Sequence, residues 1–90
     1  MDKITIKVQY CGGWGYKRYY DALTLYLDEQ FPEGKLSYIE AKDKGITGNF
    51  EITIEETGEK IHSVRWRGCT KAQTQGERDA IVAKIKEVLA

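Results

Sequence analysis

The sequence has little proline, little cysteine and no excess of either charge. One proline among 90 residues, and no long polar tract, argues against a disordered chain. The 14 basic residues balance the 14 acidic ones, so charge gives no support for binding nucleic acid or a membrane surface. No apolar run approaches the roughly 20 residues of a membrane span, and the first residues lack the apolar core of a signal peptide. Because 90 residues leave room for one core, we expect a single cytoplasmic domain, residues 1–90.

Metal and hydrolytic sites also gain little support from the sequence. Cys11 and Cys69 lie far apart and do not make a disulfide scaffold, so in a reducing compartment both are free thiols. With His62 as the one histidine, counting histidine and cysteine leaves too few ligands for zinc, and we expect His62 to be structural. No nucleophile, base and orienting group stand out for hydrolysis. The glycines at 12, 13 and 15 lack the spacing of a phosphate-binding fingerprint.

What the chain does have is a succession of periodic segments. Apolar residues alternate from Ile4 to Tyr10, which predicts a half-buried strand. Apolar residues three and four apart then predict a helix over 16–31, which ends at Pro32 and Gly34. The remaining segments predict strands over 35–41, 50–55 and 60–66, with either a bulge or a change of face between Ile61 and Val64. A last helix is predicted over 74–89, beginning with a capping box of Thr74 and Glu77.

The predicted order is therefore strand, helix, strand, strand, strand, helix. The first strand, helix and second strand fit a parallel crossover, and the hairpin that follows can extend the same sheet. We predict an α/β protein with a thioredoxin-like two-layer sandwich, order β-α-β-β-β-α, and a mixed four-stranded sheet.

The loop from Cys11 to Lys17 carries the candidate chemistry. It joins the first strand to the first helix, where the partial positive charge of a helix N-terminus stabilises a thiolate. Lys17 and Arg18 add positive charge nearby. Three residues after Cys11, where a second redox atom would complete a C-x-x-C pair, the chain has Trp14. The alternative is that Cys11 is a small buried apolar residue at a strand end.

These segments match a known family in one register. The strand end Val8-Gln9-Tyr10-Cys11-Gly12 precedes a C-x-x-x-G-Y-K loop, and the helix ends in Phe31-Pro32-Glu33-Gly34-Lys35-Leu36. Further on come Thr47-Gly48-Asn49-Phe50-Glu51-Ile52 and Ile61-His62-Ser63. Over nearly its whole length the chain resembles the selenoprotein W group of the SelT/SelW/SelH, or Rdx-type, family of thioredoxin-like proteins.

The resemblance implies a redox motif of the form C-x-x-U or C-x-x-C, where U is selenocysteine. Carried onto this chain, Cys11 is the thiol and Trp14 stands at the selenocysteine position. Selenocysteine is encoded by UGA, which some genetic codes and leaky translation systems decode as tryptophan. Trp14 is then either a decoding product or engineered replacement, or the natural residue of a homologue that has lost its second redox atom.

The function implied by the resemblance is antioxidant thiol–disulfide exchange in cell redox homeostasis, with glutathione as co-substrate and no bound cofactor. Cys11 and position 14 would be the catalytic pair, so we expect weak or no oxidoreductase activity with Trp14 present. Expected partners are glutathione and client proteins, 14-3-3 proteins among them, for a monomeric chain.

The alternative is a non-enzymatic protein-interaction module that uses the same loop, with Trp14 exposed for contact. Cys69 is either a thiol of no consequence or a second thiol near this loop.

Overall fold

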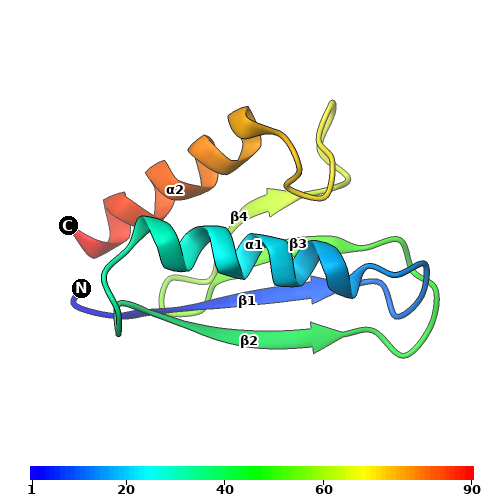
Figure 1. The fold of residues 1–90 in the computed structure, drawn as a ribbon, viewed down its shortest axis with the longest axis horizontal. Helices are drawn as coiled ribbons and strands as arrows, with labels where there is room; N and C mark the ends of the chain where they lie inside the picture. The colour runs from blue at the N-terminus through cyan, green and yellow to red at the C-terminus, as the bar shows by residue number, and fades with distance from the viewer.

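Six elements follow one another in the predicted order β-α-β-β-β-α (Figure 1). The computed structural model describes residues 1–90. The first helix begins one residue later and ends one residue earlier than its periodicity predicts, because helix ends are set by local backbone geometry. The elements are β1 (Ile4–Tyr10), α1 (Lys17–Gln30), β2 (Leu36–Lys42), β3 (Phe50–Ile54), β4 (Glu59–Ser63) and α2 (Gln75–Leu89).

The four strands form one mixed sheet in the order β2-β1-β3-β4. β1 runs parallel to β2, from the pair Ile4 and Leu36 to the pair Tyr10 and Lys42. On its other side β1 is antiparallel to β3, and β3 is antiparallel to β4. This confirms the predicted α/β class and mixed sheet. Cys11 therefore follows an interior strand, at the edge where β1 and β2 both end.

Both helices cover the same face of this sheet. Along β1 the residues alternate between buried and half-buried, and β3 repeats the pattern, so only one face is fully covered. The buried side chains of α1 and α2 join those of β1 and β3 in one core cluster. The result is the two-layer arrangement visible in Figure 1. Neither helix is long and apolar enough to pass through a membrane.

β4 is shorter than predicted and carries a bulge. The prediction of a strand to Trp66 is wrong: β4 ends at Ser63, and Trp66 donates its backbone N–H to the Ser63 carbonyl at 3.1 Å in a turn. Within β4, His62 pairs with Ile52 and Lys60 with Thr53, which leaves Ile61 as the extra residue. The slip in alternation thus reflects a bulge, and it places both Ile61 and His62 in the interior.

The second helix begins with the predicted capping box. The Thr74 hydroxyl accepts the backbone N–H of Glu77 at 3.2 Å, and Oε1 of Glu77 accepts the backbone N–H of Thr74 at 3.3 Å. These bonds satisfy amides that have no partner inside the helix. They also fix the Glu77 carboxylate beside the loop that precedes the helix.

Candidate functional site

The Cys11 thiol lies directly after β1 and is enclosed. Its residue surface is only 1% exposed. The backbone N–H of Cys11 donates to the Asn49 carbonyl at 2.9 Å, and the sulfur accepts the backbone N–H groups of Gly13 and Thr47, each at 3.4 Å. The sulfur is thus held between its own loop and the segment that joins β2 to β3.

These amides change the acidity of the thiol. Burial raises the pKa of Cys11, but the backbone N–H groups of Gly48, Gly13 and Thr47 oppose it and prevail, so the pKa lies below its ordinary value. Several amides that converge on one atom form an anion-binding concavity. The arrangement favours a thiolate at Cys11, which a purely apolar pocket would not.

The source of this stabilisation differs from the prediction. Lys17 is engaged elsewhere: its Nζ lies 2.8 Å from Oε2 of Glu40 and 3.5 Å from Oδ1 of Asp21. Arg18 donates to the Tyr19 hydroxyl at 2.8 Å. The amides that contact the sulfur belong to the Cys11 loop and to the segment before β3, whereas the sequence argument relied on helix α1 and its first basic side chains.

Residues 43–49, which lie over the thiol, form the covering loop. The carboxylate of Asp43, its first residue, accepts hydrogen bonds from the side chains of Thr47 (2.6 Å), Gln9 (2.9 Å) and Asn49 (3.1 Å). These bonds, that from Thr47 first, hold the pKa of Asp43 below its ordinary value. Gly12 fastens the loop by donating its N–H to the Gly45 carbonyl at 2.9 Å.

Sequence reasoning missed the covering loop as part of the site. The Thr47-Gly48-Asn49 motif entered only as a point of resemblance, because a loop without periodicity gives no sign of where it packs. One signal was present: parallel β1 and β2 end at the same edge of a sheet, so the segments that follow them meet there.

The Trp14 side chain is exposed to solvent, as expected, and lies outside the covering loop. Its side chain is 65% exposed, and its backbone has φ 58°, a left-handed conformation that is costly for a residue with a side chain. One edge of the indole passes over Gly48, where a Cβ would come within 3.7 Å of Cζ3. Position 14 is therefore the exposed point of the loop and Cys11 the enclosed one.

Aromatic side chains continue from Trp14 along the start of α1. The Trp14 and Tyr16 rings lie 6.2 Å apart, and the Tyr16 and Tyr19 rings 5.7 Å apart. The Lys71 ammonium sits 5.0 Å from the centre of the Tyr19 ring, a cation–π contact. The loop of residues 67–73 therefore does approach the start of α1, as one of the two alternatives for Cys69 required.

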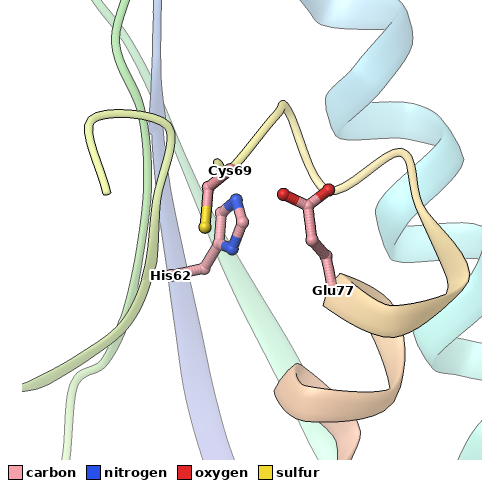
Figure 2. Close-up of side chains that lie close together, drawn as sticks. All are labelled: His62, Cys69 and Glu77. Carbon is pink, nitrogen blue, oxygen red and sulfur yellow. The ribbon is translucent and has the colours of Figure 1, made fainter. Parts of the chain in front are cut away.

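Cys69 itself faces a different set of groups. Its sulfur, a ring nitrogen of His62 and a carboxylate oxygen of Glu77 all lie within 4.8 Å of one another (Figure 2). His62 is 3% exposed, and its Nε2 lies 2.8 Å from the Thr70 carbonyl, which agrees with a structural role. Glu77 carries a third group that could bind a metal ion, beside the one histidine and a cysteine, and a count of histidine and cysteine alone leaves it out.

The one pocket of the structure does not coincide with the thiols. It has a volume of about 440 Å³ and lies where α1 ends and β2 begins, at the opposite end of β2 from Cys11. Its lining contains neither cysteine nor histidine. We therefore place the candidate chemistry at the Cys11 loop and not in this pocket.

The element order β-α-β-β-β-α and the open mixed sheet β2-β1-β3-β4, with Cys11 between β1 and α1, are those of a thioredoxin-like fold. The comparisons with known proteins then identify the group. The chain belongs to the Rdx family, whose model matches residues 5–86.

Curated relatives agree with the family. Selenoprotein W of Mus musculus and that of Rattus norvegicus are each 34% identical to this chain over 87 residues, covering 97% of this chain and 94% of theirs. Selenoprotein W of Gallus gallus is 31% identical over 86 residues, with 96% of each chain covered. The likeness therefore extends over almost the full length of both partners.

Proposed function

We propose that this chain carries the redox site of a selenoprotein W-like thiol oxidoreductase, built from Cys11 and position 14, with Trp14 in place of the reacting atom. The observation that carries the proposal is the hydrogen-bonded Cys11 sulfur, whose pKa is lowered by the amides around it. A cysteine that served only as packing would not need several N–H groups directed at its sulfur.

The two positions suit two different roles. Position 14 is exposed and can meet a peroxide or a disulfide, whereas Cys11 is enclosed one turn of the loop away. With a selenol or thiol at position 14, that group would attack a peroxide oxygen, release the other oxygen as an alcohol or water, and become a selenenic or sulfenic acid. The Cys11 thiolate would then attack the oxidised atom and displace its hydroxyl group as water, which forms a bond between the two residues. Two glutathione molecules would reduce that bond and leave as glutathione disulfide.

With Trp14 in place this cycle cannot close within the chain. Cys11 alone can still exchange with oxidised glutathione: its sulfur attacks the disulfide, forms a mixed disulfide and releases one glutathione thiolate. Because the sulfur is enclosed, this exchange requires the covering loop to open first. We therefore infer that the chain as written is a much weaker oxidoreductase than a form with a redox atom at position 14.

A peroxidase assay with glutathione tests the proposal. Trp14→Cys should gain turnover over the parent chain, and the gain should vanish in the double variant Trp14→Cys, Cys11→Ser. Trp14→Ser is the matched control, since it opens the same space without adding a thiol. Equal turnover of the parent and Trp14→Cys would overturn the assignment.

A second candidate function rests on the aromatic row of Trp14, Tyr16 and Tyr19, in which Trp14 is exposed and the two tyrosines are partly buried against the core. Such a row suits a non-enzymatic module that binds a protein partner. In that case Trp14→Ala should abolish binding while Cys11→Ser leaves it unchanged. A Cys11 thiol that is rapidly glutathionylated favours the redox function, and one that titrates like free cysteine favours the module.

The setting of the proposed function is a proposal carried over from the family resemblance. We propose a cytoplasmic, monomeric protein that takes glutathione as co-substrate and acts on client proteins, with 14-3-3 proteins as candidates. We further propose that position 14 is natively selenocysteine, consistent with relatives that are named selenoproteins. The codon for residue 14 in the native transcript decides this: UGA with a downstream insertion element supports selenocysteine, and UGG refutes it.

A further inference from the structure

A second cluster of chemically active side chains lies away from the Cys11 loop. His62 comes from β4, Cys69 from the loop after it, and Glu77 from the first turn of α2 (Figure 2). The three candidate ligand atoms, one from each side chain, all lie within 4.8 Å of one another. Since they converge from three separate elements, an ion bound among them would tie the strand, the loop and the helix together.

The donor set defines the kind of ion. One nitrogen, one sulfur and one oxygen match borderline-soft Zn²⁺, which is commonly held by three protein ligands with a fourth position left for water. Hard cations such as Mg²⁺ would require more oxygen ligands than this cluster contains. We propose that His62, Cys69 and Glu77 form a binding site for Zn²⁺.

The ligands are close to the spacing that zinc requires. Bonds of roughly 2.0–2.3 Å in a tetrahedral site place ligand atoms about 3.5 Å apart. Starting from separations within 4.8 Å, the cluster needs to contract by about 1 Å. Cys69 can supply this movement, because it is only partly buried and lies in a loop between β4 and α2.

Neighbouring groups already orient two of the ligands. The Thr70 carbonyl lies 2.8 Å from Nε2 of His62 and can only accept, so Nε2 carries the ring proton and Nδ1 is the nitrogen left for an ion. Backbone carbonyls orient metal-bound histidines in the same way. Oε1 of Glu77 accepts from the Thr70 hydroxyl and the Thr74 amide, while Oε2 accepts only from the Thr70 amide. By lone-pair count, Oε2 keeps one pair for an ion.

Without an ion, the same contacts would serve as a helix cap and a partly buried thiol. The carboxylate of Glu77 would only cap α2, and Cys69 would remain protonated because burial and the adjacent Glu77 raise the pKa of its thiol. Zinc binding differs from this alternative in one observable way: the Cys69 proton is released and its sulfur becomes a metal ligand.

The test is a titration of the purified full-length chain with Co²⁺ as a spectroscopic substitute for Zn²⁺, in a reducing buffer without thiols. We expect saturation at one ion per chain, with the visible bands of tetrahedral Co²⁺ and a sulfur-to-metal charge-transfer band, all displaced by Zn²⁺. Cys69→Ser should remove the charge-transfer band and weaken the affinity for Co²⁺ by more than about 100-fold. That is more than the loss of a group that only hydrogen-bonds to a ligand would cause.

Two control variants separate this site from its alternatives. Cys11→Ser should bind as the parent does, since its sulfur belongs to the other loop. Thr74→Ala removes half of the capping box but no ligand, so its affinity should stay within about tenfold of the parent. No saturable band, or a band that survives Cys69→Ser and disappears in Cys11→Ser, would overturn the proposal. Neither result would bear on the redox role of Cys11.

Discussion

Gly12→Ala tests whether the covering loop encloses the Cys11 thiol. A Cβ at residue 12 would lie 2.1 Å from the Asp43 carbonyl oxygen and 2.8 Å from that of Gly45. Both oxygens belong to backbone, which cannot rotate away as a side chain can. The covering loop would therefore have to move off Cys11 by about 1 Å to reach ordinary packing distance.

The cost can be estimated from the contacts that this movement breaks. The Gly12 N–H bond to Gly45 and the Thr47 N–H bond to the sulfur would be lost or lengthened, at about 1 kcal/mol each. Residual crowding adds at least about 1 kcal/mol. Since the reduced entropy of the unfolded chain offsets about 1 kcal/mol of this cost, we expect Gly12→Ala to lower the free energy of unfolding by about 2 kcal/mol in urea denaturation.

Gly13→Ala is the matched control. Its Cβ would meet only the side chain of Ile46, at 2.7 Å from Cγ1, and that side chain is 63% exposed and free to rotate. A rotamer change costs about 1 kcal/mol, and the reduced entropy of the unfolded chain offsets a similar amount. Gly13→Ala should therefore be close to neutral.

Thiol accessibility supplies the second measurement. In a Cys69→Ser background, an aromatic disulfide reagent should modify Cys11 at least about tenfold faster in Gly12→Ala than in Gly13→Ala. The reason is that each 1.4 kcal/mol by which the closed loop is destabilised raises the population of the open loop tenfold. If the two variants have the same stability and the same modification rate, the covering loop does not enclose the thiol as described.

Three further predictions concern the rest of the structure. Thr74→Ala should lower the free energy of unfolding by about 1 kcal/mol in urea, through loss of the capping box; an unchanged midpoint would contradict it. Burial and Glu40 raise the pKa of Tyr10 to about 12, so its stabilising effect is full below pH 10 and is lost as the pH rises through 12. This contribution to the free energy of unfolding, measured by urea denaturation, is at most about 2.7 kcal/mol, and Tyr10→Phe should lack it. Trp14 fluorescence should be quenched readily by iodide, with Trp66→Phe isolating its signal; a protected, blue-shifted spectrum would refute its exposure.

Much of the fold could be predicted from the sequence because its signals are local. Alternation placed β1 and β3, the stripe of Leu23 and Leu27 placed α1, and the Thr74 and Glu77 pair marked the start of α2. Each depends on residues a few positions apart. The end of β4 was misplaced because Val64 and Trp66 continue an apolar pattern after the strand has turned away.

The candidate site was less predictable because it depends on contacts between distant segments. Cys11 and Trp14 stood out for their place between strand and helix, and exposure of Trp14 is confirmed. The Thr47 amide reaches the Cys11 sulfur only because of the path of a loop 36 residues further along the chain. The approach of Cys69 to His62 and Glu77 likewise depends on a bulge and a loop, neither of which has a periodic signal.

The most direct test of the redox assignment is oxidation of Trp14→Cys in glutathione buffers of graded potential, followed by mass spectrometry after thiol alkylation. The proposed site predicts a reversible disulfide between residues 11 and 14 that forms over a defined potential range and is absent in Trp14→Ser. If Cys11 and the new thiol instead carry only mixed disulfides with glutathione, or remain free at every potential, position 14 is not the partner of Cys11 and the redox assignment is contradicted.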